Sequence, residues 1–584
     1  MKGKFYESEY EKALIDLLQA EGWQYTNGGN IHRQLREPLL VEDLNVNDLH
    51  IYLQNRYPNL TDSDVTEVIN YLRHVPGQTH FERLRNTFQL VRDGYRYTRH
   101  GDGENFDIRF IDFDNTDRNI FRVVNQFEVA YGMKNDVRIP DVLLFVNGIP
   151  LCIFELKNPT KLDVDIAQAY EQIHTRYMRD IPHLLRYCPL SCISDATDNN
   201  TRLGTTYTPY EHYYAWKKVN NEDPSAQKGI DQVRTIVKGV YEPSRFLEIL
   251  RDYVYFPDEK CGREEEIVCR YPQFFATRMM LDSIRRAFEE QTSKGGTYFG
   301  ATGCGKTYTM MFIARQLALR CKELGSPTVI MIVDRDDLQT QAGKLFLRSQ
   351  DFLQLGTVKV ITDREELKTE LSLRDSGGFF ICTIQKFCEA IGELNTRRNI
   401  ICFSDEAHRT QIRLSNKIKV VELKDIEAKV EQTSGGALAV RMIDESKIGA
   451  FVTKPYAEQL RTAFPNATFV GFTGTPIAET IQVFGDIVDR YTMQQAVDDD
   501  ITKDIKYIPR IAKVTLDSQK VKEIEDYYAK CAEEGATETD IAASKKAMSA
   551  MEQILGDEER LERLAADIIA HYTASCDNKP GVVQ

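Results

Sequence analysis

The chain has 584 residues, of which 42% are hydrophobic and 28% charged, which is typical of a globular protein with three or four domains. The net charge of −14 argues against non-specific coating of DNA, which needs clustered Lys and Arg, although it leaves room for a local basic groove. Twelve cysteines without paired spacing indicate reduced thiols of a cytoplasmic protein, and we expect neither a signal peptide nor a membrane span.

The first part of the chain has helical patterns followed by strand patterns. Apolar residues recur at helical spacing over Glu9–Glu21, and Gly22 ends this helix. Further helical patterns fill roughly residues 41–98. Strands are expected at Asp107–Asp114, Phe121–Tyr131, Asp141–Val146 and Leu151–Leu156, then a helix at Leu162–Tyr177 and a strand at Leu190–Ser194. This order predicts one α/β domain, with a hairpin turn at Asn147-Gly148.

Charged residues stand at the ends of the two hairpin strands. Pro140-Asp141 opens the first strand, and Glu155-Leu156-Lys157 closes the second, so Glu155 and Lys157 point to the same face. Two carboxylates and a lysine suit metal-dependent phosphodiester hydrolysis. Asp141 and Glu155 would hold Mg²⁺, and Lys157 would orient the nucleophile or stabilise developing charge. The alternative is an exposed strand edge with alternating charge.

From about Arg270 onward, apolar strands alternate with helices. Strands are expected at Gly296–Phe299, Thr328–Val333, Gly378–Thr383, Asn399–Ser404 and Thr468–Thr473, with a helix after Gly305. Strands of this kind predict a parallel, doubly wound sheet. We place domains at 1–260, 261–482 and 483–584, and the polar segment Asn220–Gly229 is either an exposed loop or a linker.

The clearest motif is a phosphate-binding loop at the end of the first of these strands. The sequence from Gly300 to Thr307 matches G-x-x-x-x-G-K-[ST] between an apolar strand and a helical run. Gly300, Gly303 and Gly305 would let backbone N–H groups surround the phosphates of ATP. Lys306 would reach the β- and γ-phosphates, and Thr307 would bind the Mg²⁺ that accompanies them.

A second motif follows the strand at Asn399–Ser404. Asp405-Glu406-Ala407-His408 places two carboxylates at the end of an apolar strand, where such enzymes hold Mg²⁺ and position water. Asp405 is the metal-side candidate, and Glu406 is the candidate base. By itself this string could also be the solvated start of a helix.

Together these motifs resemble the superfamily 2 helicases, including the DEAH-type translocases. The resemblance implies that Gln273, in Arg270-Tyr-Pro-Gln, reads adenine. It also implies that strand-end loops contact the DNA backbone and that Thr473-Gly-Thr-Pro couples the ATP state to DNA. The residues implied in these contacts are Arg335, Gln341, Thr383, Lys386, Thr473 and Thr475.

The hairpin motif resembles the PD-(D/E)xK nucleases, which often add an acidic residue from an early helix. Glu11 is the candidate here and Glu9 the alternative, although a plain solvated carboxylate fits Glu11 equally well. Such a nuclease in front of a DEAH motor resembles the restriction subunit of type I restriction-modification enzymes. That family carries a Q-x-x-x-Y motif, but here four residues separate Gln172 from Tyr177. Either one residue is inserted or Gln172 alone serves.

The resemblance implies a PD-(D/E)xK-like domain, then a RecA-like domain with a doubly wound parallel sheet, then a partial helical start of a second motor domain. The function implied is that of an ATP-dependent type I restriction endonuclease subunit that translocates and cleaves duplex DNA. Separate methyltransferase and specificity subunits would read the sequence. Since residues 483–584 would only begin a second RecA-like domain, we expect weak ATP binding without efficient hydrolysis.

Three rival interpretations remain. The first is a repair-type helicase or translocase whose N-terminal domain binds DNA without cutting it. The second is a type III restriction subunit, against which the domain order argues, because there the nuclease would follow the motor. The third is a non-catalytic DNA-binding or assembly module in which ATP acts only as a conformational switch.

Overall fold

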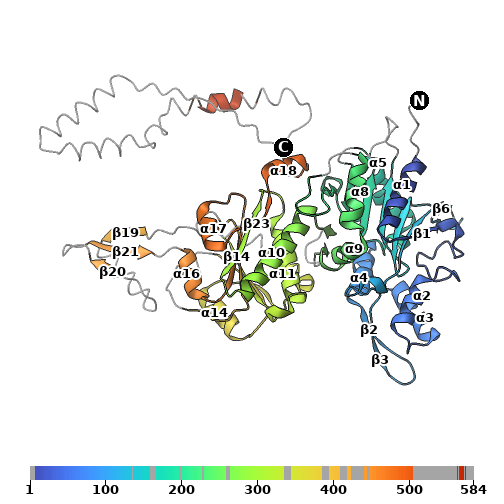
Figure 1. Cartoon of the computed structure of the whole chain (residues 1–584), viewed down its shortest axis with the longest axis horizontal. Coiled ribbons are helices and arrows are strands. Elements are labelled where there is room, and N and C mark those ends of the chain that lie inside the picture. The colour runs from blue at the N-terminus through green and yellow to red at the C-terminus, as the bar shows by residue number, and fades with distance from the viewer. Residues whose placement is uncertain are drawn as a thin grey trace. The chain divides into compact units, whose positions relative to one another are not determined.

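The N-terminal half is built around a seven-stranded mixed sheet with the strand order β1-β4-β7-β8-β9-β10-β11 (Figure 1). Neighbouring strands pair in parallel at β1–β4 and β8–β9 and antiparallel elsewhere. The bounds are β1 Gln24–Asn27, β4 Phe121–Asn125, β7 Val142–Val146, β8 Ile149–Leu156, β9 Leu190–Ser194, β10 Thr201–Gly204 and β11 Tyr214–Ala215. Every residue of β7, β8 and β9 is buried, which places the hydrophobic core along these strands.

This computed structural model describes residues 7–503 and a short helical piece within 562–573. The stretches left out are 135, 158–165, 196, 198–199, 226–228, 258–263, 334–343, 384–392, 408–416, 423–439, 443–447, 454–455, 563 and 571–572. Side chains are also left out at 417–422, 440–442, 448–453 and 456–458. The chain forms two compact units, Met1–Lys503 and Asp504–Gln584. Of the expected start of a second motor domain, 483–584, the structure describes 483–503 and the short piece within 562–573, and the rest lies outside the described residues.

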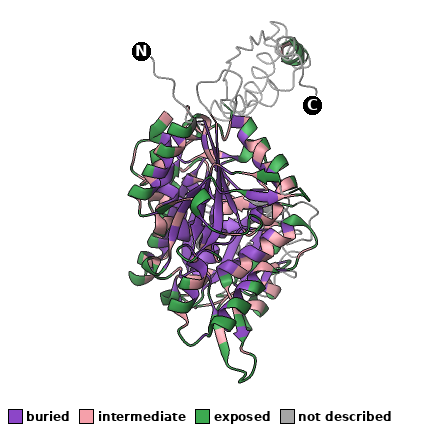
Figure 2. Ribbon diagram, turned by 90° about the vertical axis from the view of Figure 1, so that its right-hand side faces the viewer, coloured by how far each residue is buried: buried purple, intermediate pink, exposed green. Residues whose placement is uncertain are grey.

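Helices surround the N-terminal sheet, and their outer faces carry the exposed residues (Figure 2). The predicted first helix is present as α1, Glu7–Ala20, and it ends before Gly22, whose φ is +104°. The predicted helical region contains α2 Asp48–Arg56, α3 Asp62–Arg73 and α4 His80–Asp93. Thr61 and Thr79 begin the last two with capping boxes, which satisfy otherwise unpaired backbone N–H groups. Helices α8 Gly229–Val240 and α9 Pro243–Asp252 follow the sheet.

Two of the expected strands differ in extent. The one expected at Asp107–Asp114 is only the short β3, Asn105–Ile108, which pairs with β2, Tyr95–Thr98. The one expected at Phe121–Tyr131 is divided into β4 and β5, Val129–Tyr131, and β5 pairs instead with β6, Asp136–Arg138. Gln126 separates the two pieces because its φ of +52° lies in the left-handed region, which a strand cannot contain.

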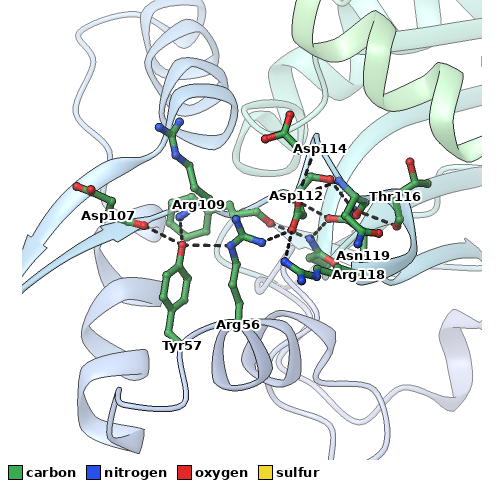
Figure 3. A network of polar contacts seen from close by, with 12 residues as sticks. Arg56, Tyr57, Asp107, Arg109, Asp112, Asp114, Thr116, Arg118 and Asn119 are labelled. Atoms are coloured by element: carbon green, nitrogen blue, oxygen red, sulfur yellow. Dashed lines mark hydrogen bonds and ion pairs between the residues drawn. The ribbon is translucent and has the colours of Figure 1, made fainter.

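The predicted hairpin turn joins β7 to β8 and is held by hydrogen bonds of the Asn147 side chain. Asn147 and Gly148 have φ values of +50° and +77°, as a type I′ turn requires. The buried Asn147 side chain donates to Asn119 Oδ1 at 2.9 Å. Asn119 in turn accepts from the backbone N–H of Asp112, whose carboxylate also binds Arg56 (Figure 3). This network fixes the hairpin register and therefore the ends of both strands.

The C-terminal half of the first unit contains a parallel seven-stranded sheet with the order β16-β17-β15-β18-β22-β14-β23, as the sequence predicts. The bounds are β14 Lys294–Gly300, β15 Thr328–Val333, β16 Val358–Val360, β17 Phe379–Thr383, β18 Ile400–Ser404, β22 Thr468–Thr473 and β23 Ile487–Tyr491. The helices include α10 Tyr271–Glu289, α11 Lys306–Leu319, α14 Arg364–Ser372, α17 Ala478–Phe484 and α18 Met493–Asp498. Three more strands, β19 Lys417–Glu422, β20 Val440–Met442 and β21 Ile448–Thr453, form a separate antiparallel sheet.

Contacts between buried charged residues join the two halves of this unit. Asp252, at the end of α9, is fully buried and accepts a hydrogen bond from Arg320 at 3.1 Å. Arg315 of α11 is 2% exposed, lies 3.9 Å from the same carboxylate and donates to the carbonyl of Arg251 at 2.9 Å. The helix after the phosphate loop is therefore bound directly to the N-terminal half.

The polar segment after β11 also contacts the parallel-sheet domain. Lys217 forms a buried ion pair of 2.8 Å with Asp499, which follows α18. Asn221 donates to Asp489 of β23 at 2.8 Å. The segment Asn220–Gly229 thus packs against the parallel-sheet domain at Asn221, near its start.

None of the described helices combines the length and apolar character that a membrane crossing needs.

Candidate nuclease and nucleotide sites

The predicted nuclease residues lie where several central strands of the N-terminal sheet end. At this side of the sheet, which we call its nuclease edge, β4, β8 and β9 end and β7 begins. Asn125, the last residue of β4, pairs with Val142, which directly follows Asp141. Val142 also pairs with Phe154, so β8 ends beside Asp141. One Asp141 carboxylate oxygen accepts a hydrogen bond of 2.6 Å from the backbone N–H of Leu156. The hairpin therefore brings Asp141 next to the Glu155–Lys157 segment, as the spacing predicts.

Four side chains form a connected network at this edge. Lys157 Nζ lies 2.6 Å from Glu155 Oε1 and donates to Gln172 Oε1 at 3.3 Å. The Gln172 amide donates to the Tyr177 hydroxyl at 2.8 Å, and that hydroxyl donates to the other Glu155 oxygen at 3.1 Å. Every member of the ring contacts two others, so displacement of one side chain disturbs the rest.

The spacing of Gln172 and Tyr177 is explained by a π-helical turn. The described helix begins as α5, Ile166–Glu171, and continues as a π-helix over Gln172–Tyr177. In a π-helix hydrogen bonds join residues five apart, which brings residues i and i+5 towards the same face, and single π-turns are frequent at functional sites. The structure therefore supports the insertion interpretation, because both Gln172 and Tyr177 reach the network.

The electrostatics of this edge are those of a buried carboxylate, Glu155, held close to a half-buried one, Asp141. Burial and, second to it, the negative charge of Asp141 raise the pKa of Glu155 to about 8, although the Lys157 ammonium acts in the opposite direction. Among the residues that the structure describes, no group of three or more His, Cys, Asp or Glu side chains is arranged to hold a metal. Two carboxylates with nearby carbonyls and water still form the oxygen-rich set that Mg²⁺ prefers.

The candidate acidic residue of the first helix reaches the same edge. Asn125 donates to Glu11 Oε1 at 2.5 Å, and Tyr25 donates to Asn125 at 3.1 Å. Glu9, the alternative, is exposed. The structure thus places Glu11 at the end of β4. Asn125 and Ser194, which also lie at this edge, had no predicted role, because neither belongs to a motif of charged residues.

The phosphate loop has the predicted strand-loop-helix form between β14 and α11. Gly303 and Gly305 have φ values of +85° and +86°, which side-chain-bearing residues rarely adopt. Lys306 is buried, and its ammonium donates to the Gly300 carbonyl at 3.3 Å and lies 3.5 Å from Glu406 Oε1. The loop and the second acidic motif therefore meet at the carboxyl edge of the sheet, where doubly wound folds bind their ligands.

The acidic motif and the Thr-Gly-Thr motif follow two adjacent strands, β18 and β22. The backbone N–H of Asp405 donates to Ile332 of β15 at 2.9 Å, and Glu406 has a left-handed φ of +47°. A Cβ atom on Gly474 would lie 3.2 Å from the Thr302 hydroxyl of the phosphate loop. In the same motif the Thr473 hydroxyl accepts from the Thr475 backbone N–H at 3.1 Å.

Gln273 is buried in the first turn of α10 and contacts the phosphate loop. Its carbonyl accepts from the Arg270 backbone N–H at 2.9 Å, and its amide donates to the Gly305 carbonyl at 3.3 Å. Thr307 is half-buried at the start of α11, and Thr383 is buried at the end of β17. The remaining predicted DNA contacts, Arg335, Gln341 and Lys386, lie outside the described residues.

Two family models match different parts of the chain. Residues 4–212 match the family model of the type I restriction enzyme R protein N terminus, and residues 272–540 match the SWI2/SNF2 ATPase model. The HindI type I restriction endonuclease subunit of Haemophilus influenzae is 32% identical over 97% of this chain and 51% of that protein. The putative MjaIXP endonuclease subunit of Methanocaldococcus jannaschii is 27% identical over 96% of this chain and 51% of that protein.

A third relative, the SsaAORF53P endonuclease subunit of Staphylococcus saprophyticus, is 23% identical over 88% of this chain and 49% of its own length. The chain thus spans about half the length of the curated relatives it matches. Nearly all of this sequence is covered in the first two matches, and the order of the two matched regions is the order of the two domains. The chain belongs to the family of type I restriction enzyme endonuclease subunits.

Proposed function

We propose that this chain provides the nuclease domain and the first motor domain of an ATP-dependent type I restriction endonuclease subunit. The observation that carries the proposal is the convergence of Asp141, Glu155 and Lys157 at one sheet edge, in the same chain as a phosphate loop that meets an acidic motif. The domains are 1–260 for the nuclease and 261–482 for the ATPase, with 483–584 leading into a second motor domain, except that β23 pairs with β14 and therefore belongs to the ATPase sheet.

At the nuclease edge, Asp141 and Glu155 would hold Mg²⁺. When bound, the metal supplies a polarised phosphate and a water of lowered pKa. Lys157 offsets the charge of Glu155, and its ammonium can orient the nucleophile or stabilise charge that develops on the phosphate. Gln172 and Tyr177 hold Lys157 and Glu155 in this arrangement, and Glu11 adds acidic character at the end of β4.

At the nucleotide edge, the glycine loop and Lys306 would bind the phosphates of ATP, and Thr307 with Asp405 would hold its Mg²⁺. Glu406 lies beside Lys306 and is the base that would position the attacking water. Gln273 would contact adenine from the first turn of α10. Thr473 and Thr475, which follow β22 beside the loop, would couple the ATP state to DNA.

The proposed substrate is double-stranded DNA, pulled by the motor and cut at the N-terminal site. Arg335, Gln341, Thr383 and Lys386 would contact the DNA backbone. Methyltransferase and specificity subunits of the same complex would supply sequence recognition in the cytoplasm. This assignment gives the chain no direct role in reading bases.

The test uses the full-length subunit mixed with its modification partners, unmodified supercoiled plasmid, Mg²⁺ and ATP. We compare plasmid linearisation by the wild type, by Lys157→Ala and by Lys238→Ala, a control at an exposed lysine of α8. Linearisation by the wild type and the control alone, and only with ATP, supports the proposal. Cutting by Lys157→Ala places the nuclease elsewhere, and ATP turnover without any cutting favours a repair-type helicase.

A further inference from the structure

Three buried hydroxyl groups are linked to the backbone of Lys157 through Ser194. The Tyr10 hydroxyl of α1 and the Ser194 hydroxyl at the end of β9 are 2.7 Å apart. Ser194 and Thr201, at the start of β10, are also 2.7 Å apart. The exposed fractions of the three residues are 1%, 1% and 2%. This chain of hydrogen bonds joins the first helix to two strands that lie far away in the sequence.

Ser194 connects these hydroxyls to the backbone of Lys157. The Lys157 N–H donates to the Ser194 carbonyl at 2.8 Å, which extends the parallel pairing of β8 and β9 beyond Leu156. The carbonyl that holds Lys157 thus belongs to a residue whose side chain is fixed by Tyr10. A shift of Ser194 would move the Lys157 backbone, and with it the ammonium that lies 2.6 Å from Glu155.

Stability alone does not account for three hydroxyls at this place. Burying a hydroxyl costs about 1–3 kcal/mol, and each hydrogen bond returns about 1 kcal/mol, so apolar side chains of similar shape would stabilise the sheet equally well. Hydrogen bonds differ from apolar contacts in being directional, and a satisfied buried network selects one arrangement of its members. The cluster is therefore better suited to fixing position than to adding stability.

The neighbouring residue of α1 makes a matching contact on the other side of the hairpin. Glu11 accepts from Asn125 at the end of β4, while Tyr10 reaches the end of β9. In the sheet order, β7 and β8 lie between these two strands. Consecutive residues of one helix thus hold the strands on both sides of the hairpin that carries Asp141 and Glu155.

We infer that Tyr10 is a positioning residue of the nuclease, which acts through Ser194 to hold Lys157 against Glu155. The inference rests on the proposed nuclease function. It predicts that loss of the Tyr10 hydroxyl slows the cutting step without weakening DNA binding or the motor.

The experiment compares Tyr10→Phe and Ser194→Ala in the full-length subunit within the assembled enzyme. The matched control is Tyr52→Phe, since Tyr52 is equally buried and its hydroxyl has no hydrogen-bond partner among the described residues. We measure kcat and KM for plasmid cleavage, ATP turnover and Tm. We expect Tyr10→Phe to lower kcat about tenfold, the size of a 1.4 kcal/mol loss, with KM, ATP turnover and Tm close to those of the wild type, and Tyr52→Phe to leave kcat unchanged. Ser194→Thr, which keeps a hydroxyl, should cleave faster than Ser194→Ala.

Two results would overturn the inference while leaving the nuclease assignment intact. One is loss of cleavage by Lys157→Ala with full cleavage by Tyr10→Phe and Ser194→Ala. The other is a fall in kcat that is matched by lower Tm and lower ATP turnover, which indicates a purely structural role. Full cleavage by Lys157→Ala itself would overturn both the inference and the proposed function.

Discussion

Replacing Glu155 with Gln should stabilise the metal-free N-terminal domain at alkaline pH. The carboxyl is fully buried, and burial together with the charge of Asp141 raises its pKa from 4.5 to about 8. A carboxyl with a higher pKa in the folded state binds its proton more tightly there than in the unfolded chain. Its contribution to stability is therefore complete below pH 4.5 and is lost as the pH rises through about 8.

The size of the effect follows from the two pKa values. One pKa unit corresponds to about 1.4 kcal/mol, so ionising Glu155 in the folded state costs roughly 5 kcal/mol above pH 8. Glutamine has nearly the same shape, still accepts from Lys157 and never ionises. The variant should match the wild type near pH 5 and exceed its free energy of unfolding by a few kcal/mol near pH 9.

The assay is urea unfolding in EDTA at pH 5, 7 and 9, followed by tryptophan fluorescence. Both tryptophans of the chain, Trp23 and Trp216, are buried in the N-terminal half, so the signal reports on this domain. Glu171→Gln, at an exposed glutamate beside the network, is the control. Added Mg²⁺ should stabilise the wild type and not Glu155→Gln. Parallel pH profiles for wild type and Glu155→Gln up to pH 9 would refute the reasoning.

Three further predictions concern single contacts. Lys306→Ala removes the cation of the phosphate loop and should weaken ATP binding at least about tenfold in a fluorescent-nucleotide titration, and unchanged affinity would contradict the assigned role. Tyr177→Phe removes hydrogen bonds to Glu155 and Gln172 and should slow plasmid cleavage with little change in DNA affinity, so a rate equal to wild type would show that the π-turn contact is dispensable. Gly148→Ala should lower the free energy of unfolding by about 2 kcal/mol or more, because φ is +77° and the new Cβ would lie 2.8 Å from the Leu49 nitrogen, and urea unfolding measures this.

Much of the fold could be predicted because buried strands are continuous apolar runs. The strands at Thr328–Val333, Leu190–Ser194 and Thr468–Thr473 occupy the predicted bounds. Phe121–Tyr131 was wrong as a single strand, because its pattern continues through Gln126. A left-handed φ at a residue other than Gly, Asn or Asp leaves little trace in the sequence.

The candidate nuclease site likewise has a part that could be predicted from the sequence and a part that could not. The spacing of Asp141, Glu155 and Lys157 relies on strand alternation and one turn, both of which are local and were predictable. The role of Tyr177 stayed open between two alternatives, because an α-helix turns once every 3.6 residues and would direct residue i+5 away from Gln172. The contacts of Tyr10 and Asp252 join segments far apart in the chain, so they require the three-dimensional fold.

The buried carboxylate of Asp252 also bears on how relatives of this protein could be recombined. A fragment cut near residue 260 would keep Asp252 and its neighbour Arg251 but lose Arg315 and Arg320, so a buried carboxylate would lose two of its three cationic partners, at a cost in stability. A nuclease domain transplanted from one relative to another would meet the same problem unless its α9 matched the α11 of the recipient. The segment to exchange between relatives is therefore larger than the nuclease domain, and it includes α11, the helix that follows the phosphate loop.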